Sequence, residues 1–222
     1  MLLSRFFITY VTNEIKLMVE QFFTLYLKIF FMMTPFFVLS VFLTMSKKLT
    51  KPEKKEVILK VSIAVMIAGV VFLLFGKYIF SLFGITLDAF KIGAGTVLFL
   101  SALDMIRGGT DIESSEAKDS DFSRHDFAIV PLAIPCVVGP GMIGILMVMG
   151  AEMAGPMNTL LVTFSLLAAV VSLAGVLLVS NKLQHLMGKQ GLEILPKITG
   201  LFVSAIGAQI VFSGIQGFFN LV

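Results

Sequence analysis

The sequence predicts an all-α, polytopic membrane protein with six transmembrane helices in two inverted-topology repeats of three helices each. Composition is the first reason: 57% of the 222 residues are hydrophobic and 14% are charged, which excludes an ordinary soluble domain. The second reason is length, because six apolar windows each approach or exceed the ~20 residues that cross a ~30 Å bilayer core. These windows are residues 22–45, 57–80, 86–106, 127–151, 157–180 and 196–219. The third reason is that the first and fourth windows contain prolines, from which we expect both spans to be broken near the midplane.

Residues 1–20 precede the first span and mix charged with apolar side chains. This pattern favours a short helix lying in the membrane interface. No apolar run long enough for a signal peptide is followed by a cleavage site, so we expect the segment to be retained.

The first span contains its own break signal, Met33-Thr34-Pro35. Thr34 is a good N-cap residue and Pro35 suits the first helical position, so the pair predicts the start of a new half-helix inside the membrane. A simple proline kink fits the same residues.

The lysine-rich segment 46–56 predicts a cytoplasmic loop. The second span offers little chemistry and predicts a scaffold helix. The third span carries the small residues 93–96, which would allow close approach of another helix, and we expect Asp104 and Arg107 to form an interfacial ion pair.

Residues 109–126 are polar and rich in acidic side chains, and they predict a cytoplasmic linker. The chain then divides into a first three-span repeat at 1–108, which includes the interfacial segment, this linker, and a second three-span repeat at 127–222.

The fourth span contains Gly139-Pro140-Gly141. Unpaired backbone groups cost several kcal/mol in hydrocarbon, so a broken span persists only where it is packed in protein or lines a polar cavity. The sixth span has one side of small and polar residues between Gly200 and Gly214, and we expect that side to face the protein interior. The segment 181–196 before it predicts an inner loop.

Sliding the chain by 105 residues places Thr34-Pro35-Phe36 on Gly139-Pro140-Gly141, and a shift of 106 places Lys91 on Lys197. Because three spans is an odd number, the second copy would enter the membrane from the opposite side. Twelve of the 17 lysines and arginines then fall on one side of the membrane. Basic residues favour the cytoplasm, so we expect both termini outside the inner (plasma) membrane.

Two facing half-helices would present unpaired N–H groups at residues 36–38 and 141–143, which suit a carboxylate, while the preceding helix ends present carbonyls that suit an ammonium group. A small neutral amino acid complements both. The candidate substrate-binding residues are Thr34, Pro35, Gly95, Ser101, Gly139, Pro140, Gly141 and Gln209. We expect Gly141→Val to abolish binding, with Gly150→Val as a tolerated control.

No motif for catalysis, nucleotide or nucleic-acid binding occurs, and we expect neither enzymatic activity nor a cofactor. His125 and His185 stand alone in the sequence, without a second ligand at metal spacing. The expected partners are the lipid bilayer and a neutral amino acid, and a second copy of the chain is a further candidate.

The run Ile129–Pro135 with Gly139-Pro140-Gly141 resembles the hallmark of the MarC family. The similarity extends to the segment 93–102, the polar linker and the segment 200–214. The resemblance implies six spans in two inverted repeats and, for some members, export or exchange of glycine, alanine and similar amino acids. Thr34-Pro35 departs from the Asn/Asp-Pro usual in the family, which makes the first side of the site bulkier and less polar. A non-transporting partner subunit, or a transporter of another small solute or ion, is the alternative.

Overall fold

The computed structural model describes residues 2–107, 132–133, 136–153 and 155–219, and the expected linker at 109–126 lies outside them. Helices dominate the described residues, which contain no strand. The elements are α1 (Leu2–Met32), α2 (Pro35–Met45), the 3-10 helix η1 (Ser46–Lys48), α3 (Lys51–Phe83), α4 (Leu87–Arg107), α6 (Pro140–Glu152), α7 (Pro156–Leu178) and α8 (Ser180–Phe218).

Four of these helices contain stretches long and apolar enough to cross a membrane. They are Lys51–Gly76, Leu87–Arg107, Pro156–Leu178 and Gln190–Phe218. Lys16–Met32 and Pro35–Met45 form a fifth candidate together, bent by 41° at the break between them. Gly141–Glu152 in α6 is apolar but shorter. The membrane class is therefore confirmed, with four or five candidate spans by length and composition.

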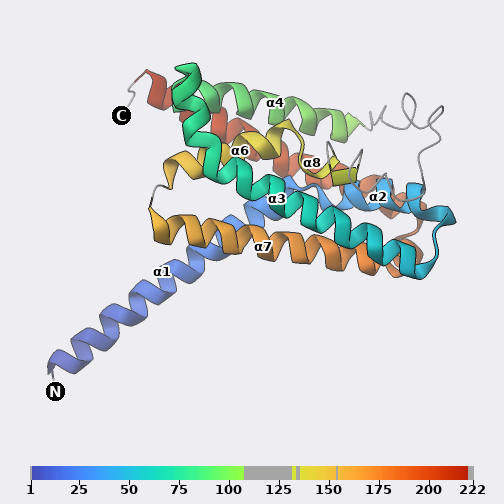
Figure 1. Cartoon of the computed structure of the whole chain (residues 1–222), viewed down its shortest axis with the longest axis horizontal. Coiled ribbons are helices and arrows are strands. Elements are labelled where there is room, and N and C mark those ends of the chain that lie inside the picture. The colour runs from blue at the N-terminus through green and yellow to red at the C-terminus, as the bar shows by residue number, and fades with distance from the viewer. Residues whose placement is uncertain (1, 108–131, 134–135, 154, 220–222) are drawn as a thin grey trace.

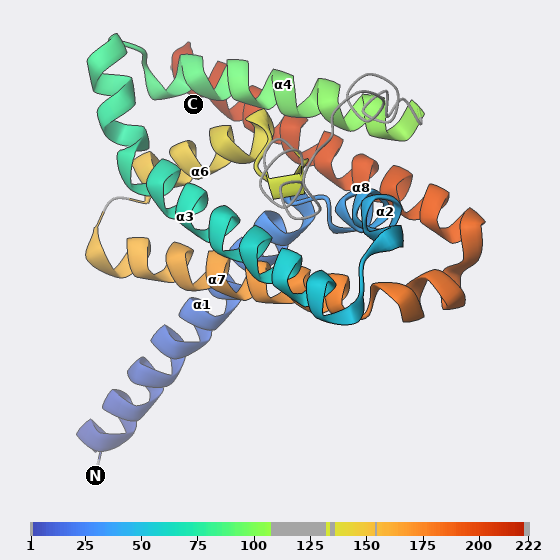
Figure 2. The same cartoon turned by 45° about the vertical axis from the view of Figure 1, so that its right-hand side comes forward.

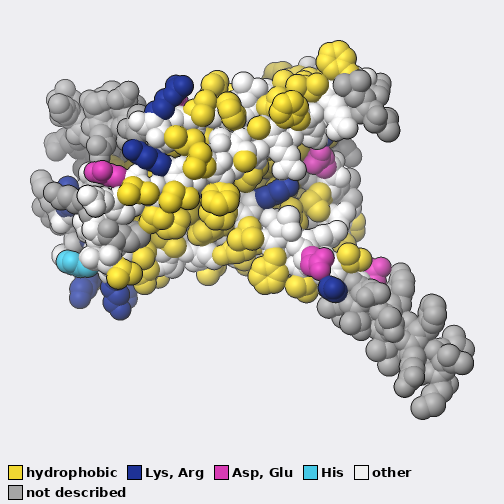
Figure 3. Space-filling model, turned by 180° about the vertical axis from the view of Figure 1, so that it is seen from behind, with side chains coloured by type: hydrophobic (Ala, Val, Ile, Leu, Met, Phe, Trp, Pro, Cys, Tyr) yellow, Lys and Arg dark blue, Asp and Glu magenta, His cyan; other side chains and the backbone are white. Residues whose placement is uncertain are grey.

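The outer faces of these helices carry large apolar side chains, as lipid-facing surfaces do. Ile67 on α3 is 60% exposed and Val171 on α7 is 62% exposed. In Figure 3, hydrophobic side chains fill the middle of the visible face, and most charged side chains lie toward its two ends. This banding is the one expected of a protein surrounded by hydrocarbon.

α1 and α2 run in the same general direction with a bend of 41°, and the long helices that follow alternate in direction, so the connections gather at two ends of the bundle (Figure 1). The turn at residues 84–86, the end of α6 and the start of α7 lie at the end where α1 begins and α8 finishes. The connections at 46–50 and 179–180 lie at the opposite end. The basic loop and the two termini are therefore at opposite ends, as the charge pattern predicts.

Two expectations about elements are wrong. The segment 181–196 is helical within α8 and bends at Gly188, where φ is 63°; its leucines and glutamines continue the helix, and a single glycine absorbs the turn. Residues 2–20 form no separate helix, because α1 runs without interruption to Met32 and its first half projects from the bundle (Figure 1).

α4 and α8 form the most extensive helix pair among the described residues, and they lie side by side in both orientations (Figures 1 and 2). A Cβ added to Gly207 would lie 2.9 Å from the backbone nitrogen of Phe99, and one added to Gly200 would lie 2.9 Å from the carbonyl oxygen of Ala102. Small residues thus let the two backbones touch, as expected for membrane helices. The expectation that the small and polar side of the last span faces the interior is confirmed for Gly200, Gly207 and Gly214, whereas Gln209 and Ser213 are exposed.

Candidate functional site

The first span is broken rather than kinked. α1 ends at Met32, α2 begins at Pro35, and Thr34 between them has φ 45° and ψ 57°. This left-handed conformation is costly for a β-branched residue, by roughly 1–2 kcal/mol. The surrounding structure therefore holds the backbone of Thr34 in place.

Hydrogen bonds at this break leave two backbone donors without acceptors. The N–H of Thr34 donates to the carbonyl of Phe31 at 3.0 Å, and the N–H of Val38 donates to the carbonyl of Thr34 at 3.0 Å. Within the described residues, the N–H groups of Phe36 and Phe37 have no backbone partner. Two of the three predicted donors are therefore available, and Val38 is already used.

The predicted cap at Thr34 does not form. Its side chain makes no hydrogen bond to the start of α2, because the left-handed backbone does not direct the hydroxyl toward the N–H groups as an extended N-cap residue would. The N-cap role expected of Thr34 is therefore wrong, although the position of the break is right.

The second break precedes α6. The N–H of Val138 donates to the carbonyl of Ala133 at 2.9 Å, a bond one residue wider than in an α-helix. Gly139 is extended, with φ −81° and ψ 173°, and Pro140 begins the helix. The first bond of α6 joins the N–H of Ile143 to the carbonyl of Gly139 at 3.0 Å. The N–H groups of Gly141 and Met142 have no backbone acceptor in the described residues.

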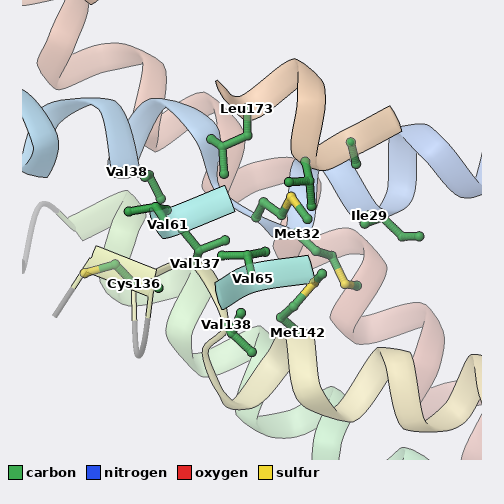
Figure 4. Close-up of a cluster of buried hydrophobic side chains, with 14 of the residues drawn as sticks. Ile29, Met32, Val38, Val61, Val65, Cys136, Val137, Val138, Met142 and Leu173 are labelled. Atoms are coloured by element: carbon green, nitrogen blue, oxygen red, sulfur yellow. The ribbon is translucent and has the colours of Figure 1, made fainter. Parts of the chain in front are cut away.

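Both breaks belong to one buried apolar cluster (Figure 4). Met32 and Val38 flank the first break, and Val138 and Met142 flank the second. In Figure 4 these side chains converge on the segment of α3 that carries Val61 and Val65. Core residues that flank both breaks therefore lie near the same segment of α3.

Among the described residues, no charged side chain is buried at either break. The buried polar and charged residues in the described part of the chain lie elsewhere, and they are Ser46, Lys91, Ser165, Ser180 and Thr199. The polar groups that the two breaks offer are thus backbone N–H and carbonyl groups, which carry partial charges of both signs.

α6 presses against α4 directly beyond the second break. A Cβ on Gly141 would meet the side chain of Leu98, and a Cβ on Gly144 would lie 2.6 Å from Cβ of Ala94. Gly141 therefore serves close packing as well as access to the helix N-terminus, because a larger residue would have to displace Leu98.

The remaining predicted residues lie apart from the breaks. Gly95 is buried in the α4–α8 contact, where its Cβ would lie 2.9 Å from the carbonyl oxygen of Gly207. Ser101 is exposed and donates to the carbonyl of Val97 in its own helix at 2.9 Å. Gln209 is also exposed. Of the eight predicted residues, the five at the breaks have neighbours in sequence that belong to one core cluster, and these three face other surroundings.

A surface hollow of about 340 Å³ is found away from the breaks, between α1 and the end of α6. Its lining residues are Leu17, Glu20, Gln21, Thr24, Leu25 and Met153. It touches none of the predicted site residues.

Sequence reasoning missed one charge cluster in which only the lysine is buried. Lys91, used above to align the two repeats, places its Nζ 2.6 Å from Glu152 Oε1 and 3.3 Å from Asp88 Oδ1. The spacing of Asp88 and Lys91, three residues apart on one helix, was an available signal. Glu152 lies 61 positions further along the chain, and no local pattern connects it to Lys91.

The ion pair expected between Asp104 and Arg107 does not form, although both residues are described. Both are exposed at the end of α4, where water competes for each charge. No group of three potential metal ligands is assembled within the described residues.

The chain matches the family model described as "MarC family integral membrane protein" over residues 19–219. It is 32% identical to UPF0056 membrane protein PH0760 of Pyrococcus horikoshii, over 91% of this chain and 98% of the relative. It is 33% identical to UPF0056 membrane protein MJ1677 of Methanocaldococcus jannaschii, over 89% of this chain and 97% of that relative. UPF0056 membrane protein YhcE of Escherichia coli is 27% identical, over 89% and 93%. No solved structure matches the chain.

Proposed function

The chain belongs to the MarC family of integral membrane proteins, and from that premise we propose that it is a secondary transporter of small neutral amino acids such as glycine and alanine. It would act as an exporter or exchanger in the inner membrane. The proposal assigns the chain no chemical reaction and no cofactor.

One observation carries this proposal: two helices break in the same buried region and leave unpaired N–H groups there. Phe36 and Phe37 contribute one pair of donors, and Gly141 and Met142 contribute the other. Donors at a helix N-terminus complement a carboxylate, and carbonyls at the end of a preceding helix complement an ammonium group.

The absence of buried charge around the described parts of the breaks favours a neutral solute. A zwitterion brings balanced charges that backbone dipoles of both signs can match. A net charge would stay uncompensated in a low-dielectric core, and that costs much more. Arginine and glutamate are therefore expected to be poor substrates.

The packing supports an arrangement of six spans in two inverted repeats. The first broken span contacts α7, and its counterpart α6 contacts α3, which is the reciprocal pattern that a pseudo-two-fold axis produces. The contact between Gly95 and Gly207 has a counterpart in that between Ala102 and Gly200. A shift of 105 residues converts 95 into 200 and 102 into 207, the same shift that relates Pro35 to Pro140.

Counterflow in liposomes tests the proposal. Vesicles that hold purified protein and unlabelled glycine should accumulate radiolabelled glycine and alanine, and excess arginine or glutamate should compete weakly. Vesicles with Lys197→Met protein serve as a control for handling, because this exposed residue lies outside the proposed site. Absence of flux for all neutral amino acids, with monodisperse protein, would favour the non-transporting partner subunit instead.

A further inference from the structure

Three helices meet at a charge cluster that the proposed site does not use, with Lys91 buried and the two carboxylates partly exposed. Lys91 on α4 is 9% exposed, and its Nζ pairs with Glu152 on α6 as well as with Asp88 on α4. α8 closes the cluster, since a Cβ on Gly217 would lie 2.5 Å from Oδ1 of Asp88. Glycine at 217 thus lets the backbone of α8 approach the carboxylate directly.

The cluster terminates a seam that starts at the second break. Along α4 the seam runs from Leu98 through Ala94 to Lys91, and these positions share one helix face. Gly141 packs on Leu98, Gly144 packs on Ala94, and Glu152 pairs with Lys91. Any route between α4 and α6 to the break from this end of the bundle must pass the ion pair.

The repeat-related lysine has different surroundings. A shift of 106 residues relates Lys91 to Lys197, which is exposed on α8 and forms no ion pair with any residue that the structure describes. The same shift relates Glu152 to Ser46, which has no carboxylate. The Lys91–Glu152 pair is therefore specific to one end of the bundle and has no counterpart at Lys197.

We propose that the Lys91–Glu152 ion pair is a gate, which must separate before a solute from that end of the bundle can reach the break at Gly139-Pro140-Gly141. This inference rests on the proposed transport function. In the closed state Glu152, whose side chain is 44% exposed, compensates the charge of Lys91, whose side chain is 11% exposed. In the open state water would also solvate Lys91, so neither state leaves this charge buried alone.

Thiol labelling at the break tests the gate without any substrate. In a Cys136→Ser background, Leu98→Cys places a reporter beside Gly141, and purified protein in detergent is treated with a charged thiol reagent. Lys91→Met and Glu152→Gln should each raise the labelling rate by about threefold or more, because each removes a partly exposed ion pair from the closed state alone. Lys197→Met is the matched control and should leave the rate unchanged.

A second reporter separates gating from general loosening. Val162→Cys lies on α7, where Val162 is 0% exposed, and its labelling should stay slow in every variant. If Lys91→Met does not fold, Glu152→Gln decides, since it keeps the Asp88–Lys91 pair. Equal labelling rates of Leu98→Cys in the parent and in the variants would overturn the gate. The gate would also be overturned if Val162→Cys were labelled faster in the same variants, or if Lys197→Met raised the labelling rate of Leu98→Cys.

The two proposals fail separately. Faster labelling at Leu98→Cys without glycine counterflow would leave the gate in place and remove the assigned substrate. Glycine counterflow with unchanged labelling would keep the substrate and remove the gate.

Discussion

At the scale of single residues, the backbone of Thr34 is the most unusual feature, since it is the one non-glycine residue with positive φ in the described part of the chain. The sequence predicted a break there, because a proline disfavours the helical conformation of the residue before it. It did not predict which non-helical conformation Thr34 adopts. That choice depends on how α1 and α2 pack against the rest of the core, and no local pattern encodes such contacts.

We expect Thr34→Gly to stabilise the protein by about 1 kcal/mol, because glycine adopts the left-handed region without the Cβ clash that threonine suffers. Thermal unfolding in detergent can be followed with a thiol-reactive dye, since Cys136 is the single cysteine and is 8% exposed. Thr96→Gly in the interior of α4 is the control and should destabilise by about 0.5 kcal/mol. Destabilisation in both variants would contradict the strain assigned to Thr34.

At the scale of helices, apolar runs and caps were sufficient to predict α4 and α7 to within a residue or two. They were insufficient for α3, which begins at Lys51, six residues before the predicted start of the span at residue 57. The earlier start is caused by a capping box that Thr50 and Glu53 form. Apolar runs and caps were also insufficient for contacts between helices. Gly150 was chosen as a tolerant position, yet a Cβ there would collide with the backbone carbonyl of Leu73 on α3.

The tolerance expected of Gly150→Val is therefore wrong, and we now expect this substitution to destabilise the fold by about 3 kcal/mol or more. A backbone carbonyl has no rotamer to change, so α3 and α6 would have to separate. Gly175→Val on α7 is the proper control, because nothing lies within 4 Å of an added Cβ there. The stability of both variants is measured by their expression level and by the temperature at which labelling of Cys136 is half complete. Normal stability of Gly150→Val would show that the two helices are less closely packed than the structure has them.

At the scale of the whole molecule, the proline breaks and the membrane class followed from sequence, whereas the convergence of the breaks on α3 and the Lys91 cluster did not. The breaks are local events caused by proline and glycine. The cluster joins residues 61 positions apart across two helices, and its partners are selected by packing. The sequence therefore predicted where the chain bends better than what the bent segments touch.

The two ends of the bundle are distinct, and the charge distribution predicts which one faces the cytoplasm. The loop at 46–50 and the start of α8 lie at one end, while α1 begins and α8 finishes at the other (Figure 1). Lysines near a membrane boundary favour the cytoplasmic side, and Lys47, Lys51, Lys54 and Lys182 lie at the first end.

We therefore expect Asn158→Cys at the start of α7 to react with an impermeant thiol reagent in intact cells, and Gln184→Cys in α8 to react only after the membrane is permeabilised. Both positions are exposed, and a Cys136→Ser background removes the native thiol. Because the two residues flank one helix, α7, a single pair of variants reports the direction in which that helix crosses. The opposite labelling pattern would place both termini in the cytoplasm, and the Lys91–Glu152 gate would then close the inner side of the protein rather than the outer one.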